Sequence, residues 1–195
     1  MQPKNFQDWY RALTELHQTD TYDEQVAQQL RVMIGLKPYA VAVLSGANTL
    51  VYAPWLLDGM HMNGRMVLHQ TSSSEPIQAL VQQQLDHDIR ITAHVQPVKS
   101  FTEDIAKNRL DVILTALESE TDPVLDYWQS LLSESGIVVV FAAPEVSAQV
   151  QEECEKDYFF SCLNGSEHSM DCLFMARKGS QHRRVRRSKS RAKTG

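Results

Sequence analysis

The sequence predicts a single α/β domain built on a mainly parallel sheet of seven strands that ends in an antiparallel hairpin, with helices on both faces. After Pro38, short apolar runs alternate with helical segments of about ten residues, which is typical of βαβ units. The last two expected strands are separated only by residues 164–169, a stretch too short for a crossover, so they pair as a hairpin. A chain of 195 residues can bury such a core without disulfides.

Two helices are expected before the sheet, because apolar residues recur there at helical spacing. The first has Phe6, Trp9, Leu13 and Leu16, and the second has Val26, Leu30, Val32, Met33 and Leu36. Between them, Thr19-Asp20-Thr21 offers N-cap side chains for the second helix.

The remaining elements follow in regular alternation. The first strand, Tyr39–Leu44, is a nearly continuous apolar run, as expected for a strand buried on both faces. Further strands are expected at Arg65–His69, Ile89–Val95, Leu110–Thr115, Gly136–Phe141, Tyr158–Leu163 and Met170–Arg177. Helices are expected at Leu50–Asp58, Glu75–Leu85, Thr102–Asn108, Asp122–Leu132 and Val146–Lys156. Five aromatic residues lie at core spacing and are predicted to pack inside: Trp9, Trp55, Trp128, Tyr158 and Phe159.

The charge is distributed unevenly, and this divides the chain. The net charge is −5, but the last nineteen residues hold nine Lys or Arg and no acid, so the rest carries a net charge of −14. Residues 1–36 are predicted to form N-terminal helices packed on the domain, residues 37–178 the α/β domain, and residues 179–195 a basic disordered tail with too few apolar residues to fold.

Cysteine usage and hydropathy predict a soluble cytoplasmic protein with no membrane partner. Cys154, Cys162 and Cys172 are odd in number and form no Cys-x-x-Cys pair, which indicates a reduced compartment. The polar N-terminus contains Asp8 and lacks the pattern of a signal peptide. The longest apolar run, Gly136 to Pro144, is far shorter than the ~20 residues of a membrane span.

Several short segments resemble a known family through their order and spacing over residues 23–178. They are residues 23–30 leading into 39–46, Leu57-Asp58-Gly59-Met60 with Gly64-Arg65-Met66-Val67, Asp111-Val112-Ile113-Leu114, Trp128-Gln129-Ser130-Leu131-Leu132 and Gly136-Ile137-Val138-Val139-Val140. In this order they resemble the class I S-adenosylmethionine-dependent methyltransferases, most closely the small O-methyltransferases related to catechol O-methyltransferase. The resemblance implies a Rossmann-like methyltransferase fold that binds S-adenosylmethionine at the carboxyl ends of its strands.

The resemblance places the cofactor pocket around seven residues near the ends of the expected strands. They are Ser45, Gly46, Asn48, His69, Gln70, Gln96 and Ala116. The first motif is degenerate, because Leu44 stands where the family has an acid and Gly46 is the one glycine of three that survives. The second strand ends in His69-Gln70 instead of the acid that takes the ribose hydroxyls.

The other contact positions are also replaced. The loop after the third strand reads Gln96-Pro97-Val98 where the family has glycine, acid and alanine. The fourth and fifth strands end in Ala116 and Ala142-Ala143-Pro144, although Glu118 and Glu145 lie nearby. Metal-dependent members place hard oxygen ligands there, so no metal is expected.

Side chains that could carry chemistry also have simpler structural explanations. His69 and His94 stand at strand ends and could act as general bases, but a histidine without a visible partner is more often structural. Gln70 or Glu75 could bind a ribose, whereas serines 72–74 are the usual caps of a helix. Cys162, His168 and Cys172 suggest a metal site, but their spacing fits no zinc motif and predicts buried cysteines instead.

These observations support a methyltransferase-fold protein whose cofactor site is degenerate, a pseudoenzyme that acts by binding a small molecule or protein or by assembly. The first alternative is an active S-adenosylmethionine-dependent methyltransferase with a divergent pocket. The second is a nucleic-acid-associated accessory protein, in which the tail acts alone because the acidic body repels phosphates. The tail residues concerned are Arg183, Arg184, Arg186, Arg187, Lys189, Arg191 and Lys193. The helices within residues 6–36 either cover the crevice or form a homodimer contact.

Overall fold

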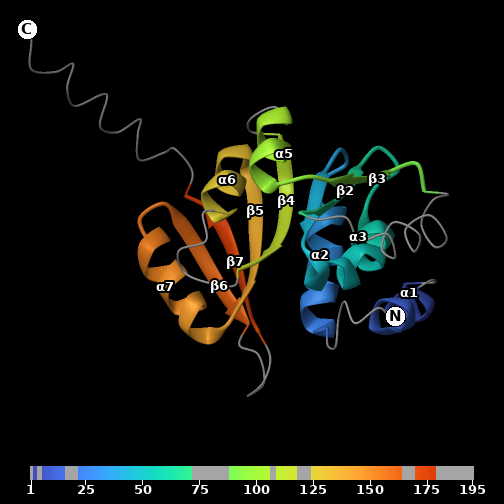
Figure 1. Ribbon diagram of the computed structural model, residues 1–195, viewed down its shortest axis with the longest axis horizontal. Coiled ribbons are helices and arrows are strands. Elements are labelled where there is room, and N and C mark those ends of the chain that lie inside the picture. The colour runs from blue at the N-terminus through green and yellow to red at the C-terminus, as the bar shows by residue number, and fades with distance from the viewer. Residues whose placement is uncertain are drawn as a thin grey trace, which may run out of the picture.

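A seven-stranded sheet forms the middle layer of the protein (Figure 1). The structure is a computed structural model that describes residues 2–3, 6–15, 22–71, 88–105, 109–117, 124–163 and 170–178. The strands are β1 (Val41–Ser45), β2 (Arg65–Gln70), β3 (Ile91–Val95), β4 (Leu110–Ala116), β5 (Leu132–Ala142), β6 (Tyr158–Leu163) and β7 (Asp171–Arg177), in the order β3-β2-β1-β4-β5-β7-β6. Strands β1 to β5 are parallel, and β7 runs antiparallel to β5 and β6. The predicted parallel sheet with its terminal hairpin is confirmed.

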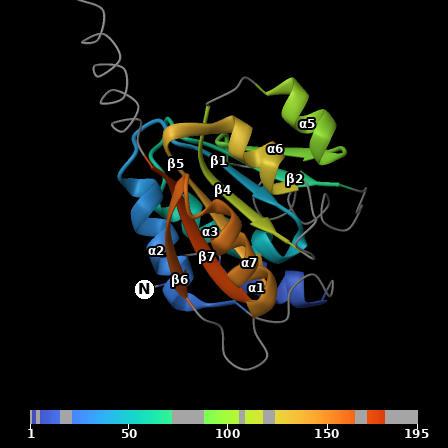
Figure 2. The same cartoon turned by 90° about the vertical axis from the view of Figure 1, so that its left-hand side faces the viewer.

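Helices cover both faces of the sheet, as predicted. One face carries α1 (Phe6–Glu15), α2 (Glu24–Gly35), the 3-10 helix η1 (Ala47–Tyr52) and α3 (Ala53–Gly59). The other carries α5 (Val98–Asp104), α6 (Val124–Leu131) and α7 (Pro144–Cys154), and Figure 2 shows α7 in front of the sheet on this side. Side chains alternate along a strand, so Leu44 joins the core of the first face and Val43 that of the second.

The N-terminal helix packs firmly on the first face. Phe6, Trp9 and Leu13 are buried, and the indole Nε1 of Trp9 donates a hydrogen bond to the Leu50 carbonyl at 2.8 Å. This contact anchors α1 on η1, which directly follows the first strand. The helical spacing of these residues therefore predicted their burial correctly.

Some expectations for the second helix and the hairpin are wrong. The N-cap of α2 is Asp23, whose carboxylate accepts from the backbone N–H of Gln25 and Val26 at 2.7 and 3.1 Å, in place of Thr19-Asp20-Thr21. Val26 and Leu30 are buried as predicted, but Val32 and Leu36 are 64% and 77% exposed, and Ala27 and Ile34 take the other buried positions of α2. Phe159 was predicted to pack inside but is 63% exposed, because β6 is an edge strand whose outer face has little cover.

Several element boundaries differ from the prediction, and the two largest differences have reasons in the backbone geometry. The helix expected at Thr102–Asn108 begins earlier, at Val98, because Pro97 forms its N-cap and accepts a hydrogen bond from Phe101 N. Strand β5 begins at Leu132 instead of Gly136, since Leu132 pairs with Leu110 before the register shifts. A Cβ at Gly136 would lie 2.8 Å from the Leu110 carbonyl oxygen, so only glycine fits this close approach.

Other expectations fall outside the described residues. They concern Leu16, the helix Glu75–Leu85 with its serine caps, Glu118, His168 and the tail 179–195. Among the residues that are described, no helix is long and apolar enough to cross a membrane.

A hydrogen-bond network around Asp111 fastens the first strand to its neighbours. The Asp111 carboxylate accepts from Val41 N at 3.1 Å, Ser133 Oγ at 3.0 Å and Lys37 Nζ at 3.2 Å. Lys37 Nζ also donates to the Ser135 carbonyl at 2.6 Å. One carboxylate at the start of β4 therefore connects β1, β5 and the turn before β1.

We expect Asp111→Ala to lower the free energy of unfolding by about 2 kcal/mol, because three donors lose a charged acceptor at once. Urea denaturation followed by circular dichroism measures the change. The control is Glu134→Ala, an exposed carboxylate on the neighbouring β5, which we expect to cost less than about 0.5 kcal/mol. Equal effects of the two substitutions would mean that the network contributes nothing specific.

Candidate functional site

The carboxyl ends of β1, β2, β3 and β4 meet at one edge of the sheet, which we call the carboxyl edge. Ser45 lies beside His69 on β2 and beside Thr115 on β4, and Gln70 lies beside Val95 on β3. The strand order reverses between β1 and β4, and such switch points are where open α/β sheets bind ligands. The structure thus gathers at this edge the residues that the sequence singled out.

Gly46 makes the turn from β1 into η1 with φ = 93° and ψ = 156°, a conformation that other residues rarely adopt. Its N–H donates to the His69 carbonyl at 3.1 Å, and its own carbonyl accepts from Thr49 N and Thr49 Oγ1. No described atom lies within 4 Å of the place where a Cβ would stand. The glycine turn is therefore present, and no described atom crowds the side on which a Cβ would stand.

His69 forms a hydrogen-bonded chain across the ends of three strands. Its Nε2 lies 2.9 Å from the Gln96 carbonyl oxygen, so Nε2 carries a proton and donates it. Its Nδ1 lies 3.0 Å from Ser45 Oγ and accepts the serine hydroxyl in the neutral ring. We call this chain the Ser45–His69–Gln96 latch.

The surroundings of His69 favour the neutral form of the ring. The side chain is fully buried, with the Phe101 ring 4.5 Å and the Trp128 ring 5.7 Å away, centroid to centroid. Burial lowers the pKa of His69, the nearby His94 lowers it further, and the hydrogen bond to Gln96 acts in the opposite direction. Both ring nitrogens are engaged within the protein, which favours a structural role over that of a general base.

The other predicted pocket residues are more exposed than Ser45 and His69. Asn48 is exposed, and its Nδ2 lies 3.9 Å from the sulfur of Met170. Gln70 and Ala116, the last residues of β2 and β4, are half-buried. His94 is exposed, with its ring 5.6 Å from that of Phe101.

The acids that the family resemblance predicts at the ends of β1 and β2 do not occur among the described residues there. Leu44 is fully buried in the core, so it offers neither an acceptor nor access where the family has an acid. After Gln70 the described chain continues only to Thr71. Within the described residues, the ends of β1, β2 and β4 carry no carboxylate that could accept the ribose hydroxyls of S-adenosylmethionine.

Sequence reasoning missed one acidic residue at this edge. Asp171 opens β7 opposite Ala142, the last residue of β5, and only 8% of it is exposed. An acid at the start of an otherwise apolar strand, Asp171-Cys172-Leu173-Phe174, was the available signal. It lies three strands away from β1, beyond β4 and β5.

The cysteines of the hairpin do not lie together. Cys162 pairs in register with Leu173 and Cys172 with Leu163, and the two side chains belong to opposite faces of the sheet. Burial raises the pKa of both thiols, most strongly that of Cys172. Among the described residues, no group of three His, Cys, Asp or Glu side chains could hold a metal ion.

Comparisons with known proteins identify the fold. The sequence matches no protein-family model and no curated protein. Solved structures do match over most of their length. A protein of Corynebacterium glutamicum has a TM-score of 0.71 and 14% identity, covering 91% of both chains. An O-methyltransferase from Bacillus cereus, solved with S-adenosylhomocysteine, has a TM-score of 0.70 and 11% identity, covering 91% of this chain and 92% of that one.

A methyltransferase from Geobacter sulfurreducens is also similar, with a TM-score of 0.63 and 14% identity, covering 88% of this chain and 90% of that one. The chain therefore has the Rossmann-like fold of the class I S-adenosylmethionine-dependent methyltransferases, and O-methyltransferases are among its structural neighbours. At these identities the likeness concerns the fold alone.

Proposed function

We propose that this protein is a methyltransferase-fold pseudoenzyme whose cofactor site is degenerate and which acts by binding or assembly. The observation that carries the proposal is the Ser45–His69–Gln96 latch at the carboxyl edge. In this latch the Ser45 hydroxyl and both nitrogens of the His69 ring are hydrogen-bonded to protein atoms. These side chains stand at the ends of β1 and β2, where the family resemblance predicts acids that bind the cofactor. Leu44, buried beside it, supports the same conclusion.

The latch opposes cofactor binding on energetic grounds. A ribose hydroxyl that leaves water needs an acceptor in the site, and an unpaired buried hydroxyl costs about 1–3 kcal/mol. Ser45 Oγ, His69 Nδ1 and His69 Nε2 are already paired with protein atoms. A ligand could bond to these atoms only if their existing buried hydrogen bonds were broken. The net gain in binding free energy would therefore be small.

The alternative, an active methyltransferase with a divergent pocket, has one observation in its favour. Gly46 keeps the left-handed turn and no described atom crowds the side on which a Cβ would stand, so the backbone at this point can be approached by a ligand. The neighbour from Bacillus cereus was solved with S-adenosylhomocysteine, and its fold spans nearly the whole of this chain. In this alternative the seven residues from Ser45 to Ala116 named above would line the pocket.

Calorimetric titration with S-adenosylmethionine and S-adenosylhomocysteine separates the two functions. We expect no saturable binding up to about 1 mM, which corresponds to a binding free energy weaker than about −4 kcal/mol. The Bacillus cereus O-methyltransferase serves as the positive control. Micromolar binding that is abolished by Gly46→Val, and also by Ala116→Phe, would overturn the proposal. The second variant is needed because Gly46→Val also strains the backbone.

We further propose that the protein works in the reducing cytoplasm. That it forms a homodimer is a separate prediction. The three cysteines are all free thiols, which supports a reduced compartment. Helices α1 and α2 use their buried apolar residues on the sheet, and Val32 of α2 and its C-cap residue Leu36 remain exposed for a second copy or another protein.

A further inference from the structure

Four large apolar side chains are exposed around the C-terminal end of α2. Val32 and Leu36 are one helical turn apart, so they share the outer face of the helix. Tyr39 follows in the turn before β1, and Met62 lies in the turn before β2. Val32, Leu36, Tyr39 and Met62 are 64%, 77%, 73% and 69% exposed, and we call these four residues the apolar patch.

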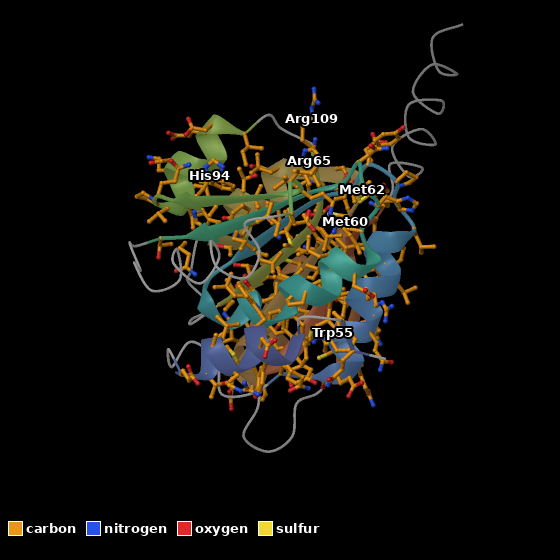
Figure 3. All side chains as sticks on the ribbon, turned by 90° about the vertical axis from the view of Figure 1, so that its right-hand side faces the viewer. Trp55, Met60, Met62, Arg65, His94 and Arg109 are labelled. Atoms are coloured by element: carbon orange, nitrogen blue, oxygen red, sulfur yellow. The ribbon has the colours of Figure 1, made fainter. Side chains whose placement is uncertain are left out.

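Hydrogen bonds hold the segments of the apolar patch together. The His61 ring nitrogen Nε2 lies 3.2 Å from the Gly35 carbonyl oxygen, so the turn that carries Met62 lies against the last turn of α2. The Arg65 backbone N–H donates to the Ala40 carbonyl at 2.9 Å, which places the starts of β1 and β2 side by side. Figure 3 shows Met62 and Arg65 at the same end of the molecule. The patch is therefore one surface built from a helix end and two turns.

The outer face of α2 changes its character along the helix. Its first turns expose Gln25, Gln28 and Gln29, whereas its end exposes Val32 and Leu36. A helix face that only contacts water is normally polar throughout. Apolar side chains exposed singly need no explanation, but several of them gathered at one place mark an interaction surface.

The charges around the apolar patch balance one another. The ion pairs at its rim are Arg31–Asp58 at 2.5 Å and Lys37–Asp111 at 3.2 Å. Two further exposed charges at this end of the sheet, Arg65 and Glu134, are of opposite sign. A neutral rim is complementary to itself, so two copies can approach here although the chain as a whole carries a net charge of −5.

The size of the apolar patch also fits a contact between two copies. Four side chains of this size, each 64% to 77% exposed, present roughly 400 Å² of apolar surface. Two copies would then bury roughly 800 Å² of apolar surface, and homodimer interfaces are about 65% apolar, so the total comes to roughly 1,200 Å². This total reaches the size of a specific protein interface.

We propose that the apolar patch is the contact surface of a homodimer, in which a second copy lies against it across a twofold axis. In such a contact the apolar side chains and the neutral rim of one copy meet the same groups of the other. The inference gives the predicted homodimer its surface, and it rests on the proposed role in binding or assembly. The carboxyl edge stays accessible in this dimer, because the patch lies at the opposite ends of β1 and β2.

Sedimentation velocity of the full chain from about 1 to about 100 µM tests the proposal. We expect a dimer whose Kd changes less than about threefold between about 0.1 and 0.5 M salt, because the contact is apolar. Leu36 lies between Val32 and Tyr39, so it stands near the twofold axis. Leu36→Lys and Leu36→Glu therefore each bring like charges together and are expected to raise Kd at least about tenfold. An equimolar mixture of the two variants is expected to restore the dimer, because lysine then meets glutamate.

The matched control is Phe159→Lys, which changes a side chain that is 63% exposed on β6, three strands away from β1 beyond β4, β5 and β7. We expect its Kd to stay within about twofold of that of the unmodified chain. A chain that is monomeric at about 100 µM overturns the proposal. So does a dimer that Leu36→Lys leaves intact, or a mixture of the two Leu36 variants that stays monomeric. Circular dichroism confirms that each variant is folded.

Two further measurements separate this proposal from its alternatives. A monomeric chain that cosediments with phosphatidylserine vesicles, and loses this binding in Leu36→Glu, would assign the patch to a membrane surface and overturn the homodimer. The titration with S-adenosylmethionine tests the proposed function independently. A monomer that binds no cofactor refutes the dimer alone, whereas a dimer that binds the cofactor refutes the pseudoenzyme alone.

Discussion

Gly59→Ala is expected to lower the free energy of unfolding by about 3 kcal/mol or more, even though alanine favours helices. A Cβ at Gly59 would lie 2.2 Å from the backbone oxygen of Arg31 and 2.9 Å from Ile34 Cγ2. The backbone oxygen belongs to the hydrogen-bonded helix α2 and cannot rotate away as a side chain can. Helix α2 must therefore move off α3, which loosens the packing of Leu30 and Ile34 on the sheet.

The sign of the change makes this prediction decisive. Gly59 is the last residue of α3 and does not have a positive φ, so helix propensity alone predicts a gain of up to about 1 kcal/mol. Gly35→Ala is the comparison, because its Cβ would lie 3.1 Å from the Gly59 carbonyl and needs only a small shift. We expect it to cost no more than about 1 kcal/mol. Thermal and urea unfolding measure both, and a stabilised Gly59→Ala would refute the close approach of α2 and α3.

His69→Ala is expected to cost about 3 kcal/mol. The substitution leaves the Ser45 hydroxyl and the Gln96 carbonyl without their partner, and it opens a cavity beside Phe101 and Trp128. His69→Gln is expected to cost less, because an amide can both accept from Ser45 and donate to Gln96. Equal losses for the two variants would indicate packing alone, with no contribution from the latch.

The same histidine predicts a pH dependence of stability. Burial lowers the pKa of His69 below its ordinary value of 6.5, so the unfolded chain binds this proton at a higher pH than the folded protein does. The stabilisation is complete above about pH 6.5 and declines as the pH falls from there toward the folded pKa. Urea titrations across this range measure the slope.

Two variants identify the group responsible for that slope. His69→Gln removes the titrating ring, so we expect it to flatten the dependence of unfolding free energy on pH below about 6.5. The comparison variant is His61→Gln, which removes an exposed imidazole on the loop before β2. A slope that persists in His69→Gln would assign the effect to another residue.

Much of the fold follows from local patterns in the sequence. A continuous apolar run such as Tyr39–Leu44 predicts a buried strand, and the spacing of Phe6, Trp9 and Leu13 predicts a helix. Each pattern shows which residues near one another in the sequence share a face. The short link at residues 164–169 permits only a hairpin, and the parallel order then brings the ends of β1 to β4 to one edge. The place of the candidate site could therefore be predicted, because it depends on topology alone.

The exact ends of several elements could not be predicted, because they depend on distant parts of the chain. Strand β5 begins at Leu132 because Leu132 pairs with Leu110 on β4. The sequence pattern at Leu132 is that of the end of the preceding helix, so it did not indicate this pairing. Phe159 has an aromatic side chain typical of core residues, but it lies on the edge strand β6 and is exposed. Periodicity reports which residues share a face and not whether another element covers that face.

The sequence by itself determined the α/β architecture and the apolar residue Leu44 where the resemblance predicts an acid, because both are properties of local residue identity. Only the tertiary structure decided what His69 does, since Ser45 is 24 residues and Gln96 is 27 residues away along the chain. It also decided that Arg65, Arg109 and Lys178 lie at the same end of the sheet, where the parallel strands begin. Hydrogen-bond partners and charge clusters arise from contacts between strands, and no local pattern encodes which distant residue a strand brings alongside.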